Sequence, residues 1–141
     1  MPAMDIPALQ DFLAQAFPQV ARDFTVEKIE ETAIRVRLNV GEQHLRPGGT
    51  VSGPSIFALA DVSLYLMILS RLGPVALAVT TNCSVDFMRK PKASTDLIAE
   101  TRLLKLGRVL AVGDVLIHSD GDTAPVARAS LTYSIPPAPR V

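Results

Sequence analysis

The sequence has little cysteine and no excess charge of either sign, and both shortages exclude classes of protein. Cys83 is the one cysteine in 141 residues, so the chain cannot form an internal disulfide, and no cysteine–histidine spacing is typical of a zinc site. The 14 basic and 14 acidic residues give zero net charge, which provides no overall field for binding nucleic acid. Because the first residues lack a basic segment followed by a cleavable apolar core, we expect no signal peptide and a cytoplasmic protein.

What is present is apolar sequence, which makes up 48% of the residues and suffices for the core of one domain over 1–141. An amphipathic pattern predicts a helix over about 5–17 that ends before Pro18. Two alternating segments follow and predict a hairpin of strands, Phe24–Ile29 and Thr32–Val40.

A long apolar segment then predicts a second helix. Pro54 suits the first helical position, and Gly73 followed by Pro74 is a stop signal, so the helix should span Ser55–Leu72. Its 18 residues are at the short limit for crossing a membrane, and Asp61 lies at its centre. A core helix of a globular domain is therefore the better interpretation, and we expect no membrane partner.

Four further segments are rich in strand-forming residues and are joined by short turns. They are Val75–Met88, Leu97–Leu106, Val109–Ser119 and Val126–Ile135, and a proline-rich tail follows at 136–141. Short connections produce an antiparallel sheet, and a helix that is apolar nearly all round has to be covered on most sides. The order of elements predicts an α+β fold in which a curved antiparallel sheet, with its core over about 24–135, wraps around one long helix.

Asp61 requires an explanation, because a carboxylate in an apolar helix is costly unless it is paired, hydrated or used. It can be a paired structural carboxylate near a subunit boundary, or a general base or nucleophile. Gly49 and Gly53 precede the same helix, whose first N–H groups are unpaired and carry the positive end of the helix dipole. Such N–H groups are suited to stabilising an oxyanion.

The motif Gly49-x-x-Ser52-Gly53-Pro54, followed by Leu59-Ala60-Asp61, resembles that of hotdog-fold acyl-CoA thioesterases of the phenylacetate-degradation type. The similarity extends over about residues 24–135, through AVTTNCSVDFMRKP and the last two predicted strands. It implies a hotdog fold and hydrolysis of an acyl-CoA thioester to a carboxylic acid and free coenzyme A. It implies no metal and no cofactor apart from the coenzyme A of the substrate.

The resemblance also implies roles for individual residues. Asp61 falls on the acidic catalytic residue, Gly53 on the glycine whose N–H polarises the thioester carbonyl, and Thr81 near a hydroxyl residue that positions water. Two positions depart from the family. Arg46 stands where the family usually has asparagine and Ser52 where it usually has histidine, and a guanidinium is not equivalent to an amide.

Several basic residues lie at predicted strand ends and are either solvated side chains or, by the resemblance, ligands of the coenzyme A phosphates. These candidates are Arg89, Lys90, Lys92, Lys105 and Arg108. Gly53 and Asp61 are eight residues apart, or roughly 12 Å along a helix, which is too far for both to act on one carbonyl in one chain. We therefore expect a homodimer with shared sites, or a homotetramer in which two such dimers pair.

Two other functions stay open at this point. One is a hotdog hydratase or dehydratase, although that chemistry usually needs a histidine near the acid and the loop offers Ser52. The other is an acyl-CoA-binding protein without catalysis, which the changes at Arg46 and Ser52 would favour.

Overall fold

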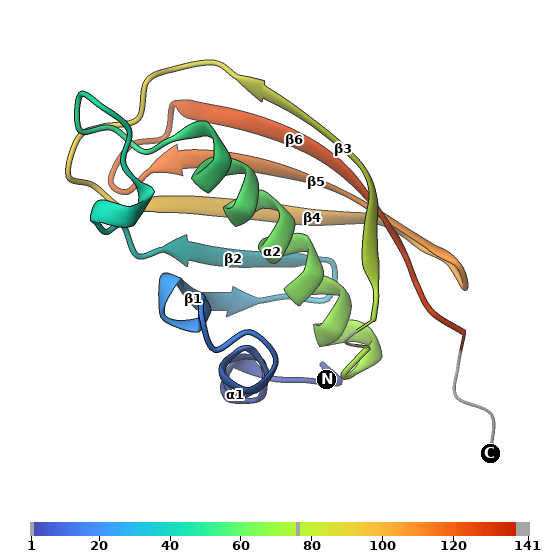
Figure 1. Cartoon of the computed structure of the whole chain (residues 1–141). Helices are drawn as coiled ribbons and strands as arrows, with labels where there is room; N and C mark the ends of the chain where they lie inside the picture. Colours follow the sequence, from blue (N-terminus) through green and yellow to red (C-terminus); the bar gives the residue numbers. More distant parts are fainter. Residues whose placement is uncertain (1, 76, 138–141) are drawn as a thin grey trace.

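The computed structural model describes residues 2–75 and 77–137, and it shows a curved sheet around a long helix (Figure 1). The six strands are β1 Phe24–Ile29, β2 Ala33–Leu38, β3 Val79–Phe87, β4 Leu97–Leu106, β5 Leu110–Ser119 and β6 Pro125–Ser134. They form one antiparallel sheet in the order β1-β2-β4-β5-β6-β3. The predicted hotdog fold is confirmed. Of the predicted tail, residues 138–141 lie outside the described part of the chain.

The central helix α2 spans Gly53–Leu72, so it begins two residues before the predicted Ser55 and ends at the predicted residue. Ser52 caps it, with its side chain accepting from the Ser55 N–H, and Gly73 ends it with a positive φ of 87°. By length and apolarity α2 resembles a membrane-spanning helix, but it is mostly buried as the core helix of this fold.

The sheet packs closely on α2 at one glycine. A Cβ added to Gly113 of β5 would lie 2.5 Å from Leu64 Cδ1 and 3.0 Å from the Arg102 carbonyl oxygen, so only glycine leaves room for Leu64 there. Leu64 is fully buried, as are Leu66 and Leu69 on the same helix. This contact fixes the helix against the concave face of the sheet.

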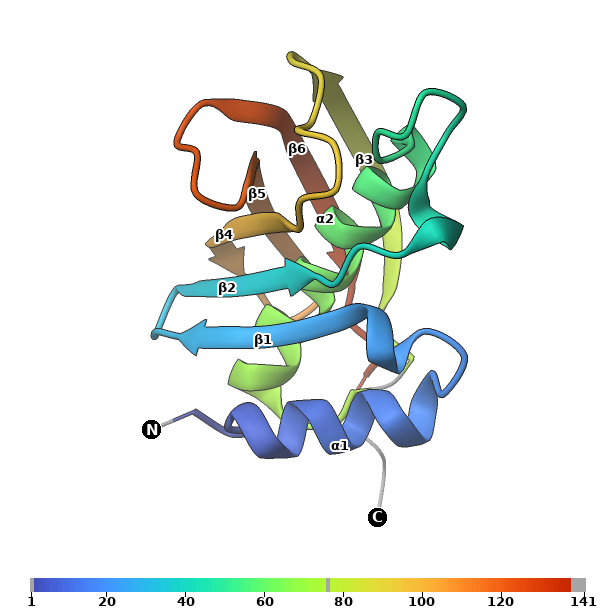
Figure 2. The same cartoon turned by 90° about the vertical axis from the view of Figure 1, so that its left-hand side faces the viewer.

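The first helix, α1 (Ile6–Ala16), runs beside β1 at one edge of the sheet (Figure 2). Asp5 caps it through the Ala8 N–H, as the sequence predicts for a helix that begins near that residue. Gln10 joins α1 to β1, since its side chain accepts from the Val26 N–H at 2.7 Å and donates to the Phe24 carbonyl at 3.3 Å. The segment after α1, Phe17 to Val20, is thereby placed next to α2.

Candidate active site

Asp61 lies on α2 with its carboxylate half-buried and held at one oxygen. Its Oδ1 accepts from the Thr80 hydroxyl at 2.6 Å and from the Tyr133 hydroxyl at 2.8 Å. Tyr133 Oη also lies 3.1 Å from the Asp61 carbonyl oxygen. Within the described chain, the Oδ2 atom has no hydrogen-bond partner. One oxygen is therefore fixed by two donors while the other is available to a water molecule or a substrate.

Burial, and after it the negative charge of Asp61, raises the pKa of Tyr133 well above its usual range. Tyr133 is 3% exposed, so its hydroxyl stays protonated and remains a donor to the carboxylate. Burial also raises the pKa of Tyr65, whose ring centre lies 6.1 Å from that of Tyr133. Burial and the Asp61 charge raise the pKa of the Cys83 thiol, which makes it a poor nucleophile.

Asp61 borders two pockets. One, of about 390 Å³, lies between α2, β3 and the end of α1, and it contains both tyrosines and Thr80. The other, of about 430 Å³, lies along the first half of α2 and contains Ser55, Phe57 and His44. His44 is buried, accepts from the Gly41 N–H at Nδ1, and has Nε2 3.2 Å from Asp23 Oδ2 without good hydrogen-bond geometry.

Thr81, the predicted water-positioning residue, does not contact Asp61 in this chain. Its hydroxyl donates to the Thr132 carbonyl at 3.3 Å, and the preceding residue, Thr80, contacts the carboxylate instead. An irregularity in the pairing of β3 with β6 lies between Thr80 and Asn82, and it leaves Thr81 without a paired partner in the ladder. The sequence indicated neither Thr80 nor Tyr133 as a partner of Asp61, and Tyr133 lies 72 residues away along the chain.

Gly53 is the first residue of α2, so its N–H has no partner within the helix. A Cβ added to it would lie 3.5 Å from Phe87 Cζ, so the Phe87 ring lies beside Gly53. Ser52 uses its hydroxyl in the helix cap and in a 3.1 Å hydrogen bond to Ser55 Oγ. The helix start is thus held rigidly, but Ser52 is engaged with the helix itself.

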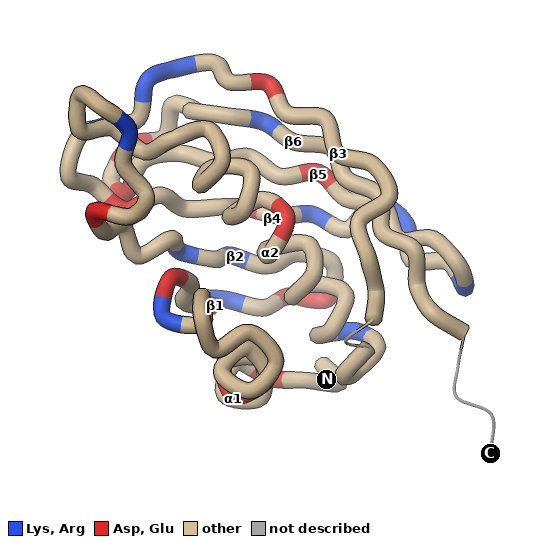
Figure 3. The backbone as a smooth tube through the Cα atoms, viewed as in Figure 1, with Lys and Arg blue, Asp and Glu red and all other residues tan. Residues whose placement is uncertain are grey.

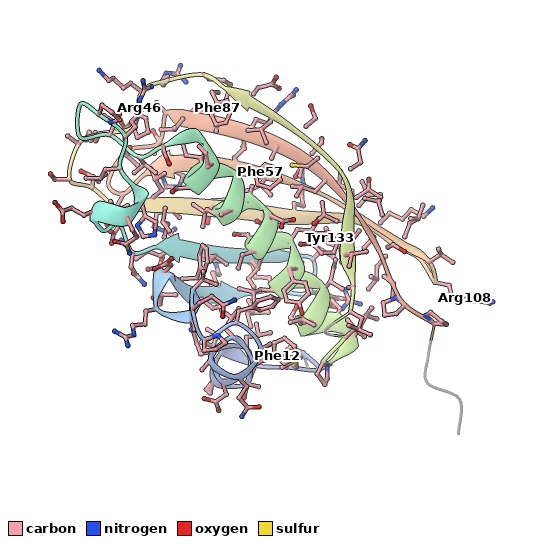
Figure 4. All side chains as sticks on the ribbon, viewed as in Figure 1. Phe12, Arg46, Phe57, Phe87, Arg108 and Tyr133 are labelled. Carbon is pink, nitrogen blue, oxygen red and sulfur yellow. The ribbon has the colours of Figure 1, made fainter. Side chains whose placement is uncertain are left out.

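The predicted basic residues do not all gather at one place. Arg46 is exposed on the loop before α2, at the same end as Phe87, and the basic segment after β3 lies at that end too (Figures 3 and 4). Arg89 and Lys90, which follow β3, are exposed, and Arg89 donates to the Pro125 carbonyl at 2.8 Å. Arg108 is at the opposite end of the sheet, in the turn between β4 and β5 (Figure 4). In the described chain, no group of three metal-ligating side chains is present.

Comparison with known proteins supports a common origin. The family model described as the thioesterase superfamily matches residues 48–126. A crystal structure of a thioesterase-family protein from Silicibacter sp. TM1040 is 57% identical, with a TM-score of 0.91 and coverage of 97% of this chain and 95% of that one.

Two further structures are similar. A mutant of the phenylacetic acid degradation protein PaaI from Thermus thermophilus is 28% identical, with a TM-score of 0.71 over 84% of this chain and 99% of that one. A hypothetical thioesterase with coenzyme A from Streptococcus pneumoniae TIGR4 is 22% identical and shares the fold, with a TM-score of 0.77 over 92% of this chain and 98% of that one. The matched segment contains Gly53 and Asp61, and the chain belongs to the thioesterase superfamily.

Proposed function

We propose that this protein hydrolyses acyl-CoA thioesters to a carboxylic acid and free coenzyme A. In this proposal Asp61 activates the attacking water or attacks the carbonyl itself, and the Gly53 N–H stabilises the oxyanion. The observation that carries the proposal is the geometry of Asp61. Two hydroxyls hold Oδ1, Oδ2 has no hydrogen-bond partner in the described chain, and the residue borders two pockets.

The start of α2 supplies the complementary charge. The free N–H of its first residue and the positive end of the helix dipole favour a negatively charged oxygen. A single oxyanion donor of this kind is worth about 2.7–4 kcal/mol of transition-state stabilisation. Ser52 supports this role indirectly, because its cap fixes the first turn that presents the Gly53 N–H.

Gly53 and Asp61 lie on the same helix, and eight residues of α-helix span roughly 12 Å. The reacting atoms have to come within about 3–3.5 Å, so we propose that two chains share each site, with the helices antiparallel about a twofold axis. Exposed apolar side chains on α2 and on the edge strand β3 favour the binding of a second chain there. Phe57 on α2 is 40% exposed, and Val79 and Phe87 on the edge strand β3 are 56% and 58% exposed. Measuring the molar mass in solution distinguishes a dimer from a tetramer made of two such dimers.

Coenzyme A carries phosphates that need cations. Arg46 lies on the loop before α2, and Arg89 and Lys90 closely follow Phe87, whose ring lies beside Gly53 at the start of α2. We propose that these three residues bind the phosphates. The coenzyme A seen with the Streptococcus pneumoniae protein supports this class of ligand. Arg108 contributes only if a second chain brings its β4–β5 turn to the site, and the same condition applies to the water-positioning role of Thr81.

One observation favours a second function. His44 borders the same pocket as Asp61, and a hydratase would need such a pair. However, His44 Nδ1 is occupied by the Gly41 N–H and Nε2 is directed at Asp23, so the imidazole is a poor candidate for proton transfer to substrate. We therefore place hydrolysis first and hydration second, with binding alone as the outcome if no product forms.

Mixed dimers test the shared site. Asp61→Ala and Gly53→Pro proteins should each be inactive, because each lacks one half of every site. After they are unfolded and refolded together, half of the dimers should be mixed and should contain one intact site, so about a quarter of wild-type thiol release should return.

Circular dichroism and size measurements confirm that both variants fold and mix. If mixed dimers form and no activity returns, the shared site is wrong. If wild-type protein converts an enoyl-CoA to a hydrated product and releases no thiol from any acyl-CoA, the hydratase hypothesis replaces hydrolysis.

A further inference from the structure

The pocket of about 390 Å³ beside Asp61 has a composition that limits what can enter it. Its walls are mostly apolar and come from α1 and the segment after it, from α2 and from the strands β3 and β6, and they include Leu13, Phe17, Val20, Val62, Tyr65 and Tyr133. Two ring pairs line it, Phe17 with Tyr65 at 5.8 Å in an edge-to-face arrangement and Tyr65 with Tyr133 at 6.1 Å. Apolar and aromatic walls of this kind bind hydrocarbon or aryl groups.

The charges of the pocket disfavour acyl groups that carry a second carboxylate. Among its described lining residues there is no lysine, arginine or histidine, and the one ionisable acid is Asp61. A ligand with a carboxylate at its far end would bury that negative charge without a cation and near another carboxylate. The pocket therefore disfavours a dicarboxylic acyl group.

The second pocket beside Asp61 differs in this respect. Its walls are about as apolar as those of the first pocket and include Phe24, Leu38 and Phe57, but they also carry the ionisable side chains of Asp23 and His44. The two pockets meet at Asp61, which borders both. An apolar acyl group that enters the second pocket would bury Asp23 and His44 beside it. The pocket of about 390 Å³, in which Asp61 is the one acid among the described lining residues, is therefore better suited to the acyl group.

Building on the proposed hydrolysis at Asp61, we propose that this pocket selects uncharged, apolar acyl groups of medium length or with one aryl ring. If each carbon group of an acyl chain takes about 30 Å³, the volume of a liquid water molecule, the pocket of about 390 Å³ holds roughly a dozen of them. That is enough for a hexanoyl, octanoyl or phenylacetyl group. An acetyl group leaves it mostly empty, and a palmitoyl chain exceeds it.

The segment from Phe17 to Val20 sets this preference, because it forms the wall on the α1 side. Phe17 ends α1 and is 37% exposed, and its backbone N–H donates to the Leu13 carbonyl at 2.8 Å. The two Gln10 hydrogen bonds to β1 hold α1 in place, so this wall is fixed relative to the sheet. Residues outside the motif shared with the family therefore determine acyl selectivity.

The experiment is a thiol-release series on the full chain with acetyl-, butanoyl-, hexanoyl-, octanoyl-, phenylacetyl-, palmitoyl- and succinyl-CoA. Each buried methylene is worth roughly a fourfold gain. We expect kcat/KM for hexanoyl-, octanoyl- and phenylacetyl-CoA to exceed that for acetyl-CoA at least about tenfold. Succinyl-CoA should fall at least about tenfold below butanoyl-CoA, which has the same number of acyl carbons. Palmitoyl-CoA should be no better than octanoyl-CoA.

Variants assign the preference to the wall. Val20→Phe fills the pocket and Phe17→Ala removes one side of it, and each should lower the octanoyl-to-acetyl ratio of kcat/KM at least about fivefold. Leu116→Phe is the matched control, since Leu116 is 46% exposed on the face of β5 that points away from α2, and it should leave the ratio unchanged. Because Val20 borders both pockets and Phe17 only the pocket of about 390 Å³, Phe17→Ala decides the assignment if Val20→Phe folds poorly.

The outcomes separate this inference from the proposed function. If no acyl-CoA releases thiol, hydrolysis is wrong, and calorimetry of acetyl- and octanoyl-CoA on the same protein still tests the pocket by the difference in their affinities. If thiol is released but acetyl- or succinyl-CoA is as good a substrate as hexanoyl-CoA, the acyl assignment is wrong and hydrolysis stands. Equal effects of Phe17→Ala on acetyl- and octanoyl-CoA also overturn it.

Discussion

The two halves of α2 have the same kind of sequence but different surroundings. From Ser63 to Ser70 every residue is buried, and the hydroxyls of these two serines donate to helix carbonyls at 2.6 Å. From Gly53 to Val62 only three residues are buried, namely Ile56, Leu59 and Ala60, and Phe57 and Asp61 border pockets. One half is enclosed by the sheet and α1, and the other is left partly uncovered.

This difference shows how one apolar helix serves both folding and chemistry. The enclosed half has no room for a charge, and its two serine hydroxyls bond to carbonyls of the helix itself. The uncovered half tolerates a carboxylate because Thr80 and Tyr133 donate to it and because pockets lie beside it. The comparison predicts that substitutions in the first half impair turnover and that substitutions in the second half impair stability.

The largest expected effect is that of Asp61→Asn on turnover. Asparagine keeps the size of the side chain but removes the charge and the basicity, so thioester hydrolysis should fall at least about a hundredfold. Steady-state thiol release measures this, and circular dichroism checks the fold. Asp114→Asn on the convex side of the sheet is the matched control, since Asp114 forms an exposed ion pair with Arg102 in the described chain, and it should stay near wild-type activity. Near-normal turnover in folded Asp61→Asn protein would remove Asp61 from the mechanism.

A substitution in the enclosed half should have the opposite profile. Leu66 is fully buried, so Leu66→Ala should lower the free energy of unfolding by about 2–5 kcal/mol while folded protein keeps most of its activity. Urea unfolding followed by circular dichroism measures the loss. Leu116→Ala, at a position that is 46% exposed on β5, should change stability far less. If Leu66→Ala mainly reduced turnover with little loss of stability, the division of α2 into two roles would be wrong.

The smallest expected effect is the titration of the tyrosines, which tests the surroundings of Asp61. Both tyrosines have a raised pKa in the folded chain, so native protein at pH about 10 should show little tyrosinate absorbance, whereas unfolded protein should show both groups titrating. Because the folded state then holds more protons than the unfolded state, stability should fall as the pH rises above about 10. Tyr133→Phe should reduce this alkaline dependence. Tyrosinate absorbance at the ordinary pKa in native protein would contradict the burial of Tyr133.

Much of the fold follows from local signals. Pro54 and Gly73 mark the start and end of α2 to within a residue or two, and the predicted strands Phe24–Ile29 and Leu97–Leu106 coincide with β1 and β4. These predictions hold because proline, glycine and alternating side chains act on the backbone within a few residues. The position of Asp61 within the apolar helix was likewise readable from the sequence.

The residues that contact Asp61 could not be predicted from local signals. The sequence indicated Thr81, but a bulge in β3 places Thr80 against the carboxylate, and alternation along a strand cannot anticipate one extra residue. Arg108 and Arg46 are both positively charged, but they lie at opposite ends of the sheet (Figure 4). Charge is visible in a sequence, whereas proximity depends on how strands pair.

The sequence by itself determined the order of elements, the apolar helix with one carboxylate, and the glycine at its start, because each depends on residue type and short-range spacing. Only the tertiary structure decided that the Tyr133 hydroxyl, 72 residues away, holds Asp61, and that the end of α1 closes an apolar pocket beside it. The physical reason is that a hydrogen bond and a pocket wall depend on distances across the sheet. Those distances are set by strand order and by close packing at residues such as Gly113 and Leu64.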